Sequence, residues 1–155
     1  MSYLLHPPLL DEAGLGLALR SYVEGFSARS GIDVDVEVPD SLERLPNDVE
    51  LVLFRVAQEA LTNVSRHSES KIAHIRLARE PSLDGANIVM TIENGQPSAA
   101  RPSQVRSLLD GPLKPSRGVG LASMRERLGQ IGGHLDVLSA GGATLVRATI
   151  PLLAA

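Results

Sequence analysis

Glu59 and Asn63 stand four residues apart in a stretch whose other positions repeat with a helical period. On a helix this spacing places a carboxylate and a carboxamide one turn apart on the same side. Side-chain oxygens of these two types bind water or a hard cation such as Mg²⁺. A solvated polar helix face would show the same spacing, so the pair alone is compatible both with a magnesium site and with ordinary surface.

The element that must position this pair is predicted by the apolar residues around it. They recur at intervals of three and four, as on the buried face of a helix, at Val49, Val52, Leu53, Val56, Ala60, Leu61 and Val64. The pattern predicts a long helix over 47–67. Pro46 precedes it, and Asn47 with Glu50 matches a capping pair at its start. One side of this helix carries a polar stripe of Arg55, Glu59, Asn63 and His67.

Two further segments contain residues suited to a binding site. Glu93-Asn94-Gly95 follows an apolar strand, so a carboxylate ends the strand where a glycine lets the backbone turn away. Gly118-Val119-Gly120-Leu121 leads into a helix, and a helix start offers free backbone amides and a positive dipole end to an anion. Each segment alone is compatible with a simple turn. Together with the helix that carries Glu59 and Asn63, they indicate a nucleotide site.

The amino-acid sequences of these segments resemble the motifs of a known family. Gln58-Glu59-Ala60-Leu61-Thr62-Asn63-Val64, followed by Arg66-His67-Ser68, resembles the N box of sensor histidine kinases, and residues 118–127 resemble their second glycine box. Both are similar to the subfamily whose response regulators carry helix-turn-helix outputs of the nitrate-response type. The resemblance extends from His6 to Leu152. It implies the catalytic and ATP-binding domain of such a kinase, with the two-layer α/β sandwich of the GHKL ATPases (the Bergerat ATP-binding fold).

The resemblance implies a role for each matched residue. Asn63 would supply its oxygen to Mg²⁺ on the phosphates of ATP, and Glu59 would hold a magnesium-bound water or act as base toward the accepting group. Glu93 would accept a hydrogen bond from the adenine amino group. The other nucleotide-binding residues implied are His67, Gly95, Gly118, Gly120, Leu121 and Thr144. Further candidates for phosphate contacts are Arg66, Lys114 and Arg117.

The first glycine box departs from the family pattern at two positions. Glu93 stands where the family has Asp, and Pro97 replaces the second glycine and removes a backbone donor. These departures motivate a second hypothesis, a degenerate nucleotide-binding-fold module that serves as a non-catalytic interaction domain. The presence of both Glu59 and Asn63 favours the first hypothesis, a protein-histidine kinase. An anti-sigma-factor serine kinase shares the fold, and the entry segment 5–11 argues against it.

The pattern of elements predicts an α+β fold, with one mixed sheet and helices on one face. Residues 1–11, with Pro7-Pro8, are expected to connect to an absent dimerisation and phosphoacceptor region, and 12–155 to form the ATP-binding domain. The proline-rich segment 97–117 has no periodicity and is expected to be the ATP lid. Helices are predicted at 15–30, 47–67 and 121–131, and strands at 32–38, 71–79, 87–92, 135–139 and 143–150.

Composition narrows the class of protein further. A chain of 155 residues is long enough for one domain with a full core. The net charge of −3 with mixed signs does not indicate nucleic-acid binding, and the lack of cysteine excludes disulfides and zinc–thiolate sites. We find no membrane-length apolar run and no signal peptide, so we expect a cytoplasmic domain. The sequence does not decide whether the parent protein is membrane-tethered.

The resemblance also implies partners. The γ-phosphoryl group of ATP would pass to a histidine on a dimerisation helix outside this chain, and then to a response regulator. The full-length protein is expected to be a homodimer that binds no nucleic acid. The isolated domain is not expected to phosphorylate itself, because His6, beside two prolines, fits a connector and not the phosphoacceptor position.

Overall fold

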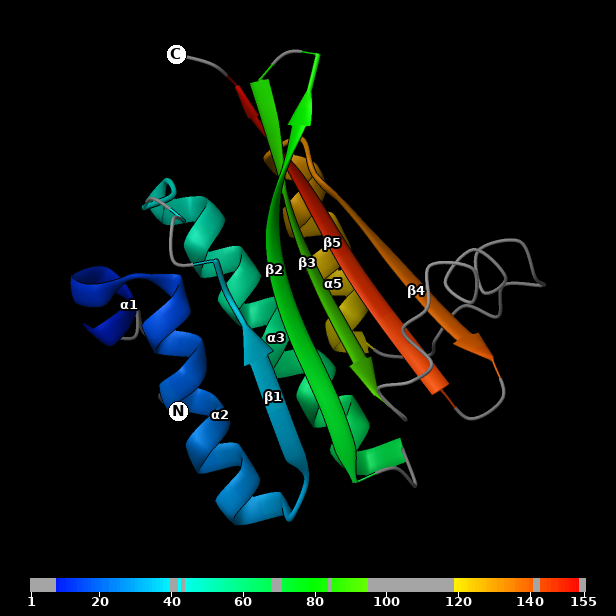
Figure 1. Ribbon diagram of the computed structural model, residues 1–155. Helices are drawn as coiled ribbons and strands as arrows, with labels where there is room; N and C mark the ends of the chain where they lie inside the picture. Colours follow the sequence, from blue (N-terminus) through cyan, green and yellow to red (C-terminus); the bar gives the residue numbers. More distant parts are fainter. Residues whose placement is uncertain are drawn as a thin grey trace.

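The computed structural model describes most of the chain, namely residues 8–39, 42, 44–67, 71–83, 85–94, 119–140 and 143–153. In chain order its elements are α1 (Pro8–Ala13), α2 (Leu15–Ser30), β1 (Asp33–Glu37), α3 (Asn47–His67), β2 (Ile72–Ser82), β3 (Gly85–Asn94), α5 (Val119–Gln130), β4 (His134–Ala140) and β5 (Ala143–Leu153). Within these ranges the strands form one sheet in the order β1-β2-β3-β5-β4 (Figure 1). The β1–β2 pair is parallel and the other neighbours are antiparallel.

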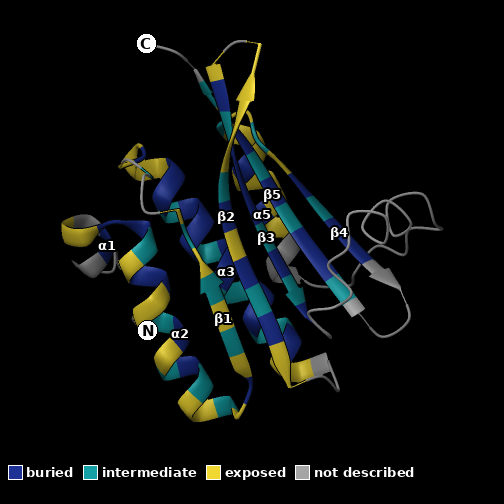
Figure 2. Ribbon diagram, in the orientation of Figure 1, coloured by how far each residue is buried: buried dark blue, intermediate teal, exposed yellow. Residues whose placement is uncertain are grey.

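The helices α2, α3 and α5 lie side by side on one face of this sheet, as Figure 1 shows. The predicted α+β fold, a mixed sheet with helices on one face, is therefore confirmed. The core lies between the two layers and is built almost entirely from aliphatic side chains, which Figure 2 shows as buried bands along α3 and the central strands. We call the sheet face that does not carry these helices the outer face.

Helix α3 is central because it packs against α2, α5, β3 and β5. The predicted bounds of 47–67 are confirmed, and the predicted apolar stripe forms its buried side, where Leu53, Val56 and Leu61 are fully buried. On the α2 side, the ring of Phe54 meets Tyr22 edge-on, with 5.8 Å between the ring centroids. The sheet and both neighbouring helices thus hold the element that carries Glu59 and Asn63.

The first turn of α3 is joined to the entry helix α1 through a buried carboxylate. Glu50 is only 2% exposed, and its Oε1 lies 3.0 Å from Nη2 of Arg44. The same Arg44 nitrogen donates a hydrogen bond to the carbonyl oxygen of Leu10 at 3.4 Å. The capping pair predicted for Asn47 and Glu50 is wrong. The Glu50 carboxylate accepts the backbone N–H of Leu45 at 3.4 Å, and not that of Asn47.

Residues 8–13 form a short helix, although the connector predicted for 1–11 contains no helix. Pro8 is the first residue of the short helix α1. Proline is favoured there because the first turn of a helix does not use the backbone N–H that proline lacks. Leu10 is fully buried in the core. Gly14 follows α1 with φ of 94°, and a Cβ there would lie 2.9 Å from Cδ of Arg44. Glycine at this position therefore lets Arg44 reach both α1 and Glu50.

The remaining bounds differ from prediction mainly in the sheet. Helix α2 ends as predicted at Gly31, whose φ of 75° gives the left-handed cap. Strands β2 and β3 run to a tighter hairpin than predicted, and β5 continues past Pro151 to Leu153. Pro151 lies past Thr149, where the pairing with β4 stops and β5 is paired with β3 alone, and proline is tolerated on a strand with one open side. No described helix has the length and apolarity to cross a membrane.

Candidate functional site

Helix α3 places the predicted pair Glu59 and Asn63 on one side, where both are half-buried. Among the described residues, Nδ2 of Asn63 is buried and has no hydrogen-bond partner. A buried amide nitrogen without a hydrogen-bond partner typically lowers the free energy of unfolding by about 1–3 kcal/mol. Such a group is typical of a site whose partner is a ligand, because binding then supplies the missing hydrogen bond.

The end of strand β3 places Asn94, and not Glu93, on the helix-facing side of the sheet. Side chains alternate along a strand, and Ile88, Met90 and Ile92 belong to the core. Asn94 continues this series and is only 1% exposed. Its Oδ1 accepts the backbone N–H of Thr144 at 2.8 Å, across the β3–β5 pair. The structure therefore brings the predicted residue Thr144 together with Asn94.

Glu93 lies on the outer face, one position out of step with the core. Its neighbour across the β2–β3 pair is His74. Burial raises the pKa of the Glu93 carboxyl above its ordinary value, and the nearby His74 acts in the opposite direction. The sheet thus separates Glu93 from the helix layer that holds Glu59 and Asn63. Strand parity was the signal that could have singled out Asn94, since Ile88, Met90 and Ile92 share its phase.

The glycine-rich turn is described only from its helical end. Gly120 and Leu121 lie in the first turn of α5, where backbone N–H groups have no partner within the helix. His67 is the last residue of α3. The predicted residues Gly95, Gly118, Lys114 and Arg117 lie outside the described residues, as do Pro97 and the expected lid at 97–117. Their predicted roles stay predictions.

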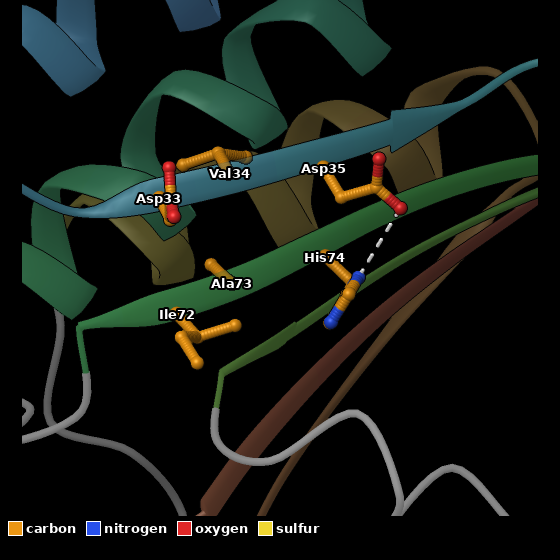
Figure 3. A pocket seen from close by; sticks show the side chains of 6 residues that line it. All are labelled: Asp33, Val34, Asp35, Ile72, Ala73 and His74. Atoms are coloured by element: carbon orange, nitrogen blue, oxygen red, sulfur yellow. Dashed lines mark ion pairs between the residues drawn. The ribbon is translucent and has the colours of Figure 1, made fainter.

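A pocket of about 330 Å³ lies elsewhere, over β1 and β2, and contains none of the predicted site residues. Figure 3 shows its lining with the helices behind the sheet, and His74 and Asp35 pointing toward one another. His74 Nδ1 and Asp35 Oδ2 are 3.5 Å apart. The pocket is lined by Asp33, Val34, Asp35, Ile72, Ala73 and His74. It therefore belongs to the edge of the sheet and not to the α3 site.

The donor set on α3 fits Mg²⁺ better than a metal that needs several protein ligands. No group of three or more His, Cys, Asp or Glu side chains within the described ranges could hold a metal ion. Mg²⁺ typically takes only one or two oxygen ligands from the protein and completes its shell with water and phosphate oxygens. Asn63, through its Oδ1, and Glu59 one turn away are compatible with that requirement, whereas the unpartnered Nδ2 of Asn63 is a donor that suits a phosphate oxygen.

Comparison with known proteins gives a family match over most of the chain. The model of the histidine kinase-, DNA gyrase B- and HSP90-like ATPases matches residues 48–154. Sensor histidine kinase MctS of Rhizobium johnstonii is 30% identical over 152 residues, which are 97% of this chain and 30% of MctS. Oxygen sensor histidine kinase NreB of Staphylococcus carnosus is 29% identical, over 98% of this chain and 40% of NreB.

Solved structures give the same picture at the level of fold. The histidine kinase domain of the blue-light activated kinase from Erythrobacter litoralis matches with a TM-score of 0.60 and 19% identity, over 89% of this chain and 61% of that one. Histidine kinase AdeS of Acinetobacter baumannii matches with a TM-score of 0.52 and 18% identity, over 86% of this chain and 60% of that one. The chain spans 30% and 40% of the lengths of MctS and NreB.

Proposed function

The chain belongs to the family of histidine kinase-, DNA gyrase B- and HSP90-like ATPases, and from this premise we propose that it is the ATP-binding catalytic domain of a sensor histidine kinase. The observation that carries the proposal is Asn63, a half-buried carboxamide with an unpartnered Nδ2, one turn from Glu59 on the helix that matches the N box. We assign the domain to the nitrate-response subfamily because the sequences of its two motifs, at 58–68 and 118–127, resemble those of that subfamily.

Phosphoryl transfer depends on positioning and on neutralising charge more than on covalent help from the protein. Asn63, with Glu59, would hold Mg²⁺, which when bound neutralises charge on the phosphate oxygens. In the proposed reaction, the bond from the γ-phosphorus to the bridging oxygen of ADP breaks and a bond to the imidazole nitrogen of the accepting histidine forms. Glu59 takes the proton that the other nitrogen of the imidazole ring loses, or orients a bound water. Gly120 and Leu121 present backbone amides to the phosphates.

For the base we propose Asn94 in the place that the motif gave to Glu93. Asn94 is buried on the helix-facing side, and the backbone of Thr144 fixes its carboxamide. A carboxamide carries both donor and acceptor atoms, as the edge of adenine does. The proposed nucleotide contacts at His67, Gly95 and Gly118 rest on the family motifs alone.

The partners follow from the reaction. The accepting histidine belongs to a dimerisation and phosphoacceptor domain outside this chain, and the phosphoryl group passes from it to a response regulator. We propose that the parent protein is a homodimer and that the domain works in the cytoplasm. Support comes from relatives that are named sensor histidine kinases, of which this chain spans the smaller part.

Calorimetric titration with ATP, with and without Mg²⁺, tests the proposal. Asn63→Ala should weaken magnesium-dependent binding roughly tenfold, because it removes one charge-assisted interaction. Asn87→Ala is the matched control, because it is the same chemical change on the outer face of β3, the face of the sheet away from Asn63. Failure of the unsubstituted chain to bind ATP at millimolar concentration would contradict the proposal and favour the non-catalytic interaction module.

A further inference from the structure

Arg55 stands one turn before Glu59 on the polar stripe of α3 and has no assigned role. Its Nε is buried, and in the described part of the chain it has no hydrogen-bond partner. The side chain of Arg55 as a whole is half-buried on α3. Its guanidinium therefore has at least one donor, Nε, that the protein leaves without an acceptor.

The obvious partner for Arg55 is Glu59, but no ion pair joins them within the ranges that the structure describes. Helical geometry explains this, because an acid that follows a base by four residues is the less favourable order for pairing. Arg55 and Glu59 are therefore both present without neutralising each other. A guanidinium is always charged, and leaving one of its N–H groups buried without a partner costs free energy.

We propose that Arg55 is a further residue of the phosphoryl-transfer site and contacts the γ-phosphoryl group of ATP. This proposal rests on the function proposed above. Arg55, Glu59 and Asn63 follow one another at about 6 Å along the helix axis. Residues four apart differ in direction by only about 40° around the helix axis, so neighbouring members of the stripe lie on nearly the same side of α3. Arg55 precedes Glu59 along α3, on the side away from Asn63.

The chemistry of arginine fits a phosphoryl group better than a spherical ion. Its planar guanidinium presents parallel donors that match two oxygens of a phosphate, and the unpartnered Nε of Arg55 is one such donor. In the transfer step negative charge spreads over the three outer oxygens of the γ-phosphoryl group. A fixed cation beside Glu59 would offset that charge, and it would also offset the repulsion between Glu59 and the triphosphate.

The experiment compares the affinity of the whole chain for ATP and for ADP, in Mg²⁺, by calorimetry. A contact with the γ-phosphoryl group predicts that Arg55→Gln weakens ATP binding roughly tenfold and leaves ADP binding unchanged. Arg55→Lys keeps the positive charge but loses the two parallel donors. Its affinity for ATP should therefore lie between those of the unsubstituted chain and of Arg55→Gln. Arg20→Gln on the exposed surface of α2 is the matched control and should leave both affinities unchanged.

Each outcome separates the inference from the proposed function. Equal changes in ATP and ADP affinity, or no change in either, would overturn the role of Arg55. If the unsubstituted chain bound neither nucleotide, the proposed function itself would fail. Thermal unfolding of each variant is measured alongside. If Arg55→Gln no longer folds, Arg55→Lys replaces it; a reduced preference for ATP over ADP then supports the contact, and an unchanged preference contradicts it.

Discussion

Asn94 and Thr144 are paired across β3 and β5, and the side-chain Oδ1 of Asn94 accepts the backbone N–H of Thr144 at 2.8 Å. This bond fixes the orientation of a carboxamide that is 1% exposed. It also joins two segments that lie 50 residues apart in the chain. The end of β3 that faces the helix layer is therefore set by tertiary structure and not by β3 alone.

Substitution of Asn94 should affect ATP binding more than substitution of its neighbour Glu93. Asn94→Ala removes the proposed adenine contact and leaves the Thr144 N–H without its acceptor, so we expect roughly tenfold weaker ATP binding. Glu93→Gln lies on the outer face and should change the affinity less than about twofold. Calorimetric titration with ATP measures both, and the reverse ranking would restore Glu93 as the adenine residue.

Loss of Arg44 should destabilise the fold, because it leaves the carboxylate of Glu50 buried without its cation. Arg44 is 48% exposed and Glu50 3%, so solvent screens part of the effect. We expect Arg44→Ala to lower the free energy of unfolding by about 1–3 kcal/mol, measured by urea titration. Arg76→Ala is the control. It breaks an exposed pair with Glu37 and should cost less than about 1 kcal/mol.

The raised pKa of Glu93 predicts a specific dependence of stability on pH. Because burial disfavours its charged form, the folded chain holds this proton above the ordinary pKa of 4.5, where the unfolded chain has lost it. Glu93 therefore lowers stability as pH rises through the folded pKa, and has no such effect below 4.5. Glu93→Gln should be more stable than the parent chain at pH 7, and this advantage should vanish in acid. Thermal unfolding at several pH values tests this, and a constant difference would contradict it.

The buried side of α3 should be sensitive to cavity formation. Leu61 is fully buried, and Leu61→Ala should cost about 2–5 kcal/mol of unfolding free energy. Leu17 on α2 is 52% exposed, so Leu17→Ala, the same chemical change, should cost well under half of that. Denaturant unfolding followed by circular dichroism gives both values. Equal costs would mean that α3 does not form the centre of the core.

Much of this arrangement was predictable from sequence, and α3 shows why. Its apolar period is long and regular, and Pro46 marks its start, so the bounds at 47 and 67 follow from local pattern. The stop at Gly31 was predictable for the same reason, because only the local backbone decides a left-handed cap.

The features that escaped sequence reasoning depend on contacts between distant segments. The role of Glu50 depends on the approach of Leu10 and Arg44, which no local pattern encodes. Continuation of β5 through Pro151 depends on where β4 stops. The position of Asn94 is a different case. The motif favours Glu93 as the adenine residue, which stays a prediction, whereas the alternation of Ile88, Met90 and Ile92 places Asn94 on the helix-facing side.

The parallel pairing of β1 with β2 has a consequence for the order of folding. Parallel strands need a crossover connection, and here α3 is that crossover. The hairpins β2–β3 and β4–β5 close over short sequence separations, whereas the β1–β2 pair must close around the whole of α3, and short-range pairs form faster. We therefore expect α3 and the edge strand β1 to assemble together and after the hairpins, so that a chain with its full sheet also has Glu59 and Asn63 in place.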